Sequence, residues 1–375
     1  MAKRRPSGAG LRGQSAGTTS LCTVGKSGSG LTYRGYDISE LAARASFEEV
    51  AYLLLKGALP TQAELNAYIE KLVGLRQLPA ALKTVLEQIP ASARPMDVMR
   101  TAVSMLGQLE TEQDFSQQQD AADRLLAILP AIICYWYRFS HEAVRIDTES
   151  DDRSTGAHFL HLLQDQKPSE LHTQVMNASL ILYAEHEFNA STFAARVCAS
   201  TLSDIHSCIV SAIGTLRGPL HGGANEAAMR MLEKWISADQ AEAGITAMLA
   251  RKEKVMGFGH AIYRTSDPRN TIIKAWCKKL ATAVGDTSLY PMSVRCEEVM
   301  WREKKLFCNA DFFHASAYNF MGIPTRLFTP IFVISRVTGW AAHIMEQRDN
   351  NRIIRPSADY RGPDQATWVA IEERV

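Results

Sequence analysis

The sequence predicts a mostly α-helical fold, and three observations support that prediction. Apolar residues recur at the helical spacing i, i+3, i+4, i+7 along most of the chain. Two segments open with a Ser or Thr followed three residues later by Glu, the capping box that marks helix starts. Period-two runs, which indicate strands, are nearly absent outside one hairpin signal near the N-terminus.

The first expected elements are a lead and a hairpin. Residues 1–18 are expected to form a flexible lead, because the opening stretch is basic and rich in Gly and Ser. The hairpin would pair residues 21–24 with 31–33 through a Gly/Ser turn at 25–30.

Helices are expected for most of the remaining chain. The capping box at Ser46 opens an apolar stripe that Gly57 and Pro60 close, and the capping box at Thr61 opens another that reaches Leu72. Further helices are expected at 95–106, 121–138 with a kink at Pro130, 171–186, 194–213, 224–234 and 312–321.

Composition limits the classes of protein that fit. Hydrophobic residues make up 46% and charged residues 22% of the 375, as in ordinary soluble domains. The net charge of +1 argues against a nucleic-acid or anionic-membrane binder, and the longest apolar stretch, 127–137, is too short to span a bilayer. The seven cysteines are odd in number and form no C-x-x-C pair, and the lead lacks the apolar core of a signal peptide. We expect a cytoplasmic protein with reduced thiols.

The length fits one large and one small domain that share an interface. The segment 222–320 is richer in charge than its flanks. It is therefore expected to be a small mobile domain inserted between the two parts of a large helical domain, 19–221 and 321–375.

Three Gly-rich or polar segments carry residue types suited to chemistry. His221 lies on a Gly-rich turn before an expected helix, whose positive end disfavours an imidazolium ion. His260 is followed by Arg264 and Arg269, and arginine recognises carboxylates in a bidentate manner, which suits a small di- or tricarboxylate. Asp311 lies beside aromatic residues, and desolvation raises the pKa of a carboxylate and makes it a better base.

Each segment alone also has a plain structural interpretation. His221 fits a turn histidine, the arginines fit a solvated surface loop, and Asp311 fits the N-cap of the helix expected at 312–321. Arg336, within an apolar helix, and Arg355, beside a Pro turn, add two more cations, and a buried arginine usually pairs with an acid or binds an anion.

Together these segments resemble the citrate synthase family. Residues 257–269, GFGHAIYRTSDPR, are similar to the family's signature, and 218–225 and 309–312 match the other two catalytic segments in the right order. The resemblance runs from about Leu11 to the C-terminus and includes 33–37 and 185–192. It implies the citrate synthase fold, a large helical domain plus a smaller inserted helical domain and a short N-terminal β-hairpin.

The resemblance also implies roles for single residues. Asp311 would take the α-proton of an acyl-CoA thioester, His221 would hydrogen-bond the thioester oxygen, and His260 would polarise the ketone of oxaloacetate and donate a proton. The residues implied in holding oxaloacetate are His186, Arg269, Arg336, Arg355 and Phe332. Those implied in binding coenzyme A are Lys254, Val255, Met256, Gly257, Phe258 and Arg295, the last at the phosphates.

The family further implies substrates and assembly. No tightly bound cofactor is expected, because the coenzyme A thioester is itself a substrate. Arg355 is similar to an arginine that reaches the neighbouring subunit's site, which implies a homodimer or a higher homo-oligomer. Bond formation away from water implies that the small domain closes over oxaloacetate before the acyl-CoA reacts.

The acyl group is a finer expectation. Residues 94–101, 156–161, 299–302 and 353–360 resemble the family members of the propionate pathway, which implies condensation of propionyl-CoA with oxaloacetate and water to 2-methylcitrate and CoA. A pocket discriminates one methyl group by only about 1–3 kcal/mol, so acetyl-CoA is an expected secondary substrate.

Three other functions remain as alternatives. One is a citrate synthase that prefers acetyl-CoA, and another is a non-catalytic helical scaffold, against which the joint presence of His221, His260 and Asp311 argues. A metal-dependent lyase needs a ligand set, but His158 and His161 lack a third ligand at convincing spacing, so no metal site is expected. The positions that depart from the family pattern are Arg94, Ala157, His206 and Cys308, and the last predicts a less rigid loop before the base.

Overall fold

The secondary structure of the computed structural model, which describes residues 10–11, 13–26 and 30–374, is almost entirely helical, and this confirms the predicted fold class. Three short strands, β1 (Cys22–Val24), β2 (Leu31–Tyr33) and β3 (Tyr36–Asp37), form an antiparallel sheet in that order. The first two are the predicted hairpin. Part of its turn and most of the predicted lead lie outside the described residues.

The helices follow the sheet in an unbroken series. They are α1 (Ile38–Arg44), α2 (Phe47–Lys56), α3 (Gln62–Gly74), α4 (Ala80–Gln88), α5 (Pro95–Leu109), α6 (Gln118–Glu142), α7 (Thr155–Gln164), α8 (Glu170–Tyr183), α9 (Ala190–Ser200), α10 (Ile205–Leu216), α11 (Ala224–Leu232), α12 (Ala238–Ala250), α13 (Pro268–Ala283), α14 (Leu289–Lys304), α15 (Ala310–Phe320) and α16 (Phe328–Asp349). Short 3₁₀ helices lie at Phe115–Gln117, Thr325–Leu327 and Ile371–Glu373.

Helix starts and stops agree with the local chemistry at several points. Ser46 and Thr61 both form complete capping boxes, as predicted, and Gly57 ends α2 in the left-handed conformation. The helix predicted at 171–186 ends at Tyr183, so His186 lies in the loop after α8.

The single helix predicted at 194–213 is wrong. The chain forms two helices there, because Leu202 adopts a left-handed φ of 63° and Asp204 caps a new helix by accepting a hydrogen bond from the backbone N–H of Ser207. The N-cap interpretation of Asp311 is also wrong. Asn309 is the N-cap of α15, and Asp311 lies in its first turn.

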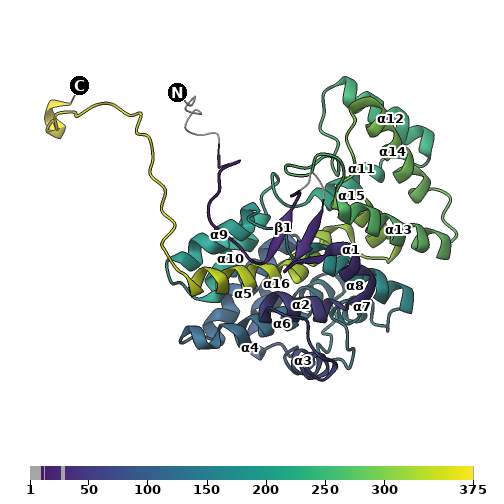
Figure 1. Ribbon diagram of the computed structural model, residues 1–375, viewed down its shortest axis with the longest axis horizontal. Helices are drawn as coiled ribbons and strands as arrows, with labels where there is room; N and C mark the ends of the chain where they lie inside the picture. Colours follow the sequence, from purple (N-terminus) through teal and green to yellow (C-terminus); the bar gives the residue numbers. More distant parts are fainter. Residues whose placement is uncertain (1–9, 12, 27–29, 375) are drawn as a thin grey trace.

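Helix α16 is the centre of the molecule. It packs against α2, α5, α6, α8, α9, α10 and α11, and Figure 1 shows it running through the middle of the lower body. In the described chain, the segment Thr325–Asp349 is the one that is long and apolar enough to cross a membrane, and 94% of its most apolar window is buried inside the fold. Its apolar composition therefore matches its place in the core.

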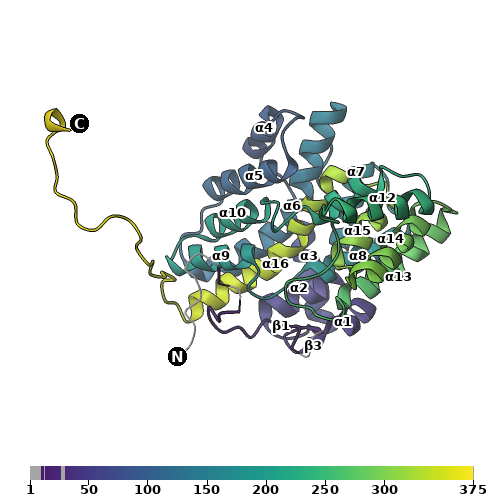
Figure 2. The same cartoon turned by 90° about the horizontal axis from the view of Figure 1, so that it is seen from above.

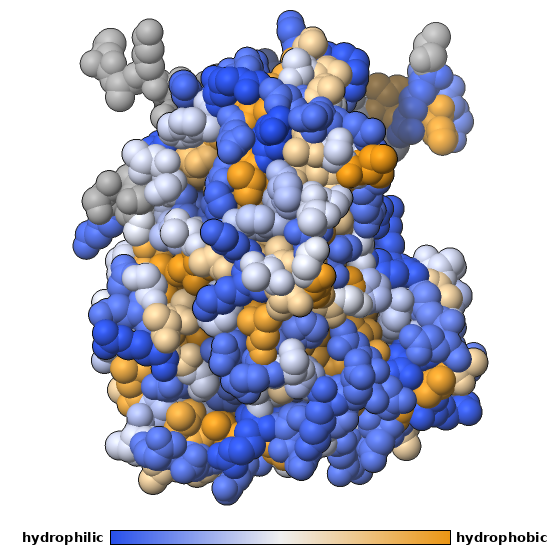
Figure 3. Space-filling model, turned by 90° about the vertical axis from the view of Figure 1, so that its right-hand side faces the viewer, coloured by the Kyte–Doolittle hydropathy of each residue, from blue (hydrophilic) through white to orange (hydrophobic). Residues whose placement is uncertain are grey.

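Helices α12, α13 and α14 stand apart from the lower body in Figures 1 and 2. Helix α12 packs on α14, and α13 and α11 pack on α15. On the face shown in Figure 3, hydrophilic residues predominate and hydrophobic ones are interspersed among them. The predicted boundaries of a small mobile domain at 222 and 320 stay a prediction.

The C-terminal segment, 350–374, leaves the body as an extended strand of chain (Figures 1 and 2). It exposes several large apolar side chains, Ile353, Tyr360, Trp368 and Ile371. Within the single chain, these side chains lack the burial that apolar groups of this size normally find.

Candidate active site

A cavity of about 910 Å³ brings most of the predicted site residues together. Its wall is built from the loops that follow α8 and α10, the segment 253–262, the first turns of α13 and α15, and the side of α16. The predicted residues that line it are His186, His221, His260, Arg269, Asp311, Phe332 and Arg336, together with the whole segment 254–258.

His221, in the loop before α11, is held as a neutral imidazole. Its Nε2 accepts the backbone N–H of Ser191 at 3.1 Å and lies 2.8 Å from the Ser191 hydroxyl, which itself donates to Asn189. Since Nε2 accepts, the proton resides on Nδ1, which is left as a donor. Burial and the nearby Arg336 lower the pKa of His221 to about 4.

His260 has the opposite tautomer. Its Nδ1 accepts the backbone N–H groups of Ile262 at 3.1 Å and Tyr263 at 3.3 Å, so the proton resides on Nε2. Burial and Arg269 lower its pKa to about 4. The ring of His186 lies 5.1 Å from that of His260, and burial followed by Arg269 holds the pKa of His186 well below its usual value. Two neutral imidazoles thus lie side by side among cations.

Asp311 is the carboxylate of the cavity. Its Oδ1 accepts the hydroxyl of Tyr183 at 2.8 Å. Burial raises the pKa of Asp311, although the Tyr183 hydrogen bond and Arg269 act in the opposite direction. A smaller cavity of about 30 Å³ is lined by both Asp311 and His221, so the carboxylate and the imidazole face a common space. A base and a hydrogen-bond donor are therefore available on the two sides of one small group.

Two buried arginines provide positive charge. Arg269 forms two hydrogen bonds with Asp267, at 3.0 and 2.8 Å, and burial acts against this ion pair, which nevertheless raises the pKa of Arg269. Arg336 donates its Nε to the backbone carbonyl of Tyr183 at 2.6 Å and stacks over Phe332. Within the described chain, the terminal nitrogens of Arg336 form no hydrogen bond or ion pair with a carboxylate, and a buried cation in this state is suited to a bound anion.

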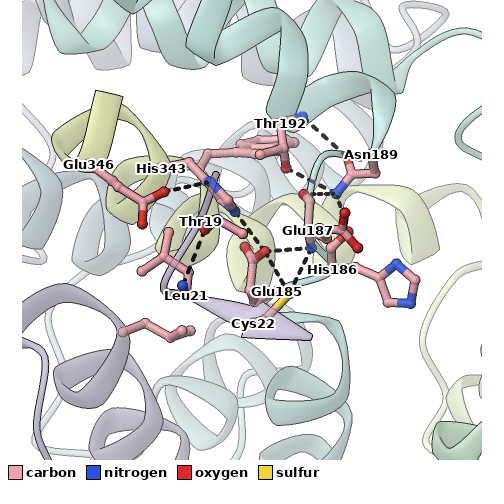
Figure 4. Close-up of polar contacts among 12 residues, drawn as sticks. Thr19, Leu21, Cys22, Glu185, His186, Glu187, Asn189, Thr192, His343 and Glu346 are labelled. Atoms are coloured by element: carbon pink, nitrogen blue, oxygen red, sulfur yellow. Dashed lines mark hydrogen bonds and ion pairs between the residues drawn. The ribbon is translucent and has the colours of Figure 1, made fainter. Parts of the chain in front are cut away.

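A buried network fixes the loop that carries His186 (Figure 4). The Oε1 of Glu185 accepts hydrogen bonds from His343 Nε2 at 2.8 Å, the backbone N–H of Glu187 at 2.6 Å and Cys22 Sγ at 3.4 Å. His186 points away from these contacts, toward the opposite side of the loop (Figure 4). The network thus ties β1 and α16 to the two residues that flank His186.

His343 is neutral in this network. Arg196 donates to its Nδ1 at 2.9 Å, so the imidazole proton is on Nε2 and is directed at Glu185. Arg196 also donates to Glu346 at 2.7 Å, and Glu346 accepts the backbone N–H of Ser20 at 2.7 Å. The charges of the network are therefore paired from the N-terminal segment to α16.

Two of the predicted site residues do not line the cavity. Arg295, on α14, pairs with Asp239 at 3.2 Å and Glu242 at 2.7 Å. Arg355 is exposed on the extended C-terminal segment.

The loop before the base is paired on both sides. Gly259 N–H donates to Phe307 at 2.8 Å and Asn309 N–H donates to Gly257 at 2.9 Å, around buried Cys308. These backbone bonds hold 307–309 against 257–259, beside the predicted coenzyme A segment.

The sequence alone did not single out several residues that shape the cavity, among them Tyr183, Ser191, Asp267 and Glu185. Asp267 stood inside the signature segment and Ser191 followed a capping asparagine, so both carried a local signal. Tyr183 and Glu185 carried none, because one ends an apolar helix and the other pairs with a residue 158 positions away. The described residues include no group of three or more His, Cys, Asp or Glu placed to hold a metal ion.

Comparison with known proteins places the chain in a family. The family model described as citrate synthase, C-terminal domain, matches residues 10–357. The chain therefore belongs to the citrate synthase family, and it is a condensing transferase.

Individual relatives differ in the acyl group that their names imply. The 2-methylcitrate synthase of Shewanella oneidensis is 68% identical over 99% of each chain. Citrate synthase 2 of Bacillus subtilis is 44% identical over 98% of this chain and 99% of its own. Among solved structures, the Thermoplasma acidophilum citrate synthase, in ternary complex with carboxymethyl coenzyme A and oxaloacetate, superposes with a TM-score of 0.90 at 32% identity, covering 97% of this chain and 98% of its own.

Proposed function

We propose that this protein condenses propionyl-CoA with oxaloacetate and water to give 2-methylcitrate and CoA, with acetyl-CoA as a secondary substrate. The observation that carries the proposal is the 68% identity, over essentially full length, with a 2-methylcitrate synthase. The cavity supports it, because it combines a carboxylate, two neutral imidazole donors and two buried arginines.

The proposed reaction begins at the acyl-CoA. Asp311 removes the α-proton while the Nδ1–H of His221 donates to the thioester oxygen, so that no free enolate is formed. A neutral imidazole suits this task, since a hydrogen-bond donor at neutral pH must not have lost its proton to solvent exchange with a cation.

The enol carbon then attacks oxaloacetate. The Nε2–H of His260 donates to the ketone oxygen and passes it a proton as the carbon–carbon bond forms. The carboxylates of oxaloacetate are held by Arg269, Arg336 and His186, with Phe332 packed beside them. Water then hydrolyses the thioester of the product and releases CoA.

We place coenzyme A along the segment 254–258, which lines the mouth of the cavity. Closure of a small mobile domain, 222–320, would exclude water from the bond-forming step. This places the reaction in the cytoplasm, as the cysteine pattern favours.

We also propose that the enzyme is a homodimer in which Arg355 acts in the neighbouring subunit. Its position on an extended segment with exposed apolar side chains supports this. Two inactive variants, Arg355→Ala and Asp311→Asn, test it when unfolded together and refolded. Mixed dimers contain one intact site, so activity should return, whereas continued inactivity of well-folded mixtures contradicts a shared site.

The proposed activity is tested by thiol release from propionyl-CoA and acetyl-CoA, each with oxaloacetate. We expect a higher kcat/KM for propionyl-CoA and loss of both activities in Asp311→Ala. Preference for acetyl-CoA supports the second candidate, a citrate synthase, which the 44% identical relative favours. No release from either substrate by the folded protein leaves only a scaffold and refutes the proposal.

A further inference from the structure

Tyr183 stands between the two halves of the proposed reaction. It is the last residue of α8 and is 1% exposed, yet it lines the cavity. Its hydroxyl donates to Asp311 Oδ1 at 2.8 Å, and its backbone carbonyl accepts Arg336 Nε at 2.6 Å. One residue therefore contacts both the proposed base and an arginine proposed to bind oxaloacetate.

The ring of Tyr183 is held on two sides. The imidazole of His314 stacks on it at 4.2 Å between ring centroids, with an interplanar angle of 28°, and Phe332 packs at 4.7 Å. His314 is itself fixed, because its Nδ1 donates to the carbonyl of Ala310 at 2.6 Å. The phenol therefore has little freedom to turn away from the carboxylate.

We propose that Tyr183 is a positioning residue for the base: its hydroxyl occupies Oδ1 of Asp311, orients the carboxylate and leaves Oδ2 to accept the α-proton. This inference rests on the proposed role of Asp311 as the base. Tyr183 acts through Asp311 and transfers no proton itself. Burial and the adjacent carboxylate hold the phenol pKa well above its usual value, so the hydroxyl stays a donor throughout the working range of pH.

The hydrogen bond also affects the basicity of Asp311. The groups that act on this carboxyl are Tyr183 from α8, Arg269 and Asp267 at the start of α13, and Arg336 from α16. Burial raises the pKa and Tyr183 lowers it, because the hydroxyl stabilises the charged form. Loss of the hydroxyl should therefore move the acidic limb of the pH–rate profile to higher pH.

The test compares Tyr183→Phe with a matched control in the full-length enzyme. Tyr318→Phe also removes a buried phenol hydroxyl, on α15, but that hydroxyl is bonded to Ser179 at 2.5 Å and not to the base. For each variant kcat and KM are measured by thiol release from pH 5 to 9, with propionyl-CoA that is either unlabelled or deuterated at the α-carbon.

We expect Tyr183→Phe to raise the acidic limb by about one pH unit, the loss of one hydrogen bond to a charged group. Misplacement of the base should lower kcat by about tenfold or more and increase the deuterium isotope effect, while KM for oxaloacetate stays within about twofold. Tyr318→Phe should leave the limb and the isotope effect unchanged.

A second measurement keeps the wild-type shape. Replacing Tyr183 by 3-fluorotyrosine makes the phenol a stronger donor, so the acidic limb should move to lower pH, opposite to the phenylalanine variant. This arm remains decisive if Tyr183→Phe does not fold.

An unmoved limb in both Tyr183 variants, or a shift equal to that of Tyr318→Phe, overturns the inference. Asp311→Asn separates this from failure of the proposed function. If Asp311→Asn turns over like the wild type, the base assignment itself is wrong. If Asp311→Asn is inactive and the Tyr183 variants behave as the wild type, only the role of Tyr183 is wrong.

Discussion

Replacing Glu185 by alanine should weaken both the fold and the binding of oxaloacetate. The carboxylate is fully buried and accepts hydrogen bonds from His343, the Glu187 backbone and Cys22. Alanine leaves these donors without a partner, and each buried unpaired group costs about 1–3 kcal/mol. Breaking a buried charged pair costs about 3–5 kcal/mol, so we expect the free energy of unfolding to fall by about 4 kcal/mol.

Binding should suffer because the same contacts hold the loop around His186. The backbone of Glu187, directly after His186, loses its anchor on Oε1. A shift that costs about 1.4 kcal/mol of binding raises KM for oxaloacetate by about tenfold. Urea unfolding and steady-state kinetics measure the two effects in one preparation.

Glu48→Ala is the matched control. Glu48 is also a buried carboxylate, which accepts the backbone N–H of Thr155 at 2.7 Å, but it lies outside the cavity. It should destabilise the fold and leave KM unchanged. A loss below about 1 kcal/mol in Glu185→Ala, or a KM for oxaloacetate equal to that of the control, refutes the reasoning.

The stability of this pair also has a defined dependence on pH. Burial raises the pKa of Glu185, but His343 and Arg336 lower it more, so its folded pKa lies below the unfolded value. Its contribution to stability is then present above the unfolded pKa and is lost as the pH falls through the folded pKa. The difference in stability between wild type and Glu185→Ala should shrink in that acidic window.

Three further predictions concern the cavity. Because the folded pKa values of His221 and His260 are lowered to about 4, the unfolded chain binds protons first, and stability should fall between the unfolded value, about pH 6.5, and pH 4; urea unfolding of His260→Gln should show a smaller slope, and an unchanged slope contradicts the burial argument. Gly257→Ala should lower stability by about 1–3 kcal/mol in thermal melts, because Gly257 has a φ of 87° and an added Cβ would meet Phe312 at 2.8 Å; an unchanged melting temperature would mean that the loop can move aside. Arg295→Ala should change KM for propionyl-CoA by less than about twofold, because its charge is used in exposed ion pairs; a tenfold rise would show that it contacts coenzyme A after all.

Local signals in the sequence were sufficient where the physics is local. The capping boxes at Ser46 and Thr61 and the hairpin could be predicted, because each depends on residues within a few positions of one another. The break between α9 and α10 was missed although Asp204 is a good N-cap residue, since the apolar pattern continues on both sides of it. A left-handed leucine at 202 has no signature in composition.

The candidate site divides in the same way. His221, His260 and Asp311 stood in distinctive segments, so their types and order could be recognised. Their tautomers and tuning could not, because these depend on partners such as Ser191 and Tyr183, which are 30 and 128 positions away. Long-range pairing of this kind is fixed by how the helices pack, which a linear pattern does not encode.

The central place of α16 has a consequence for biosynthesis. This helix is the last one of the chain, yet it packs against helices from α2 onward. A ribosome adds residues at about 5–20 per second, so the earlier helices emerge well before their shared partner. During that interval their apolar faces are open to solvent and to one another, which makes truncation near residue 328 a route to aggregation. Complete synthesis, and not any earlier intermediate, sets the moment at which this enzyme can first bury its core.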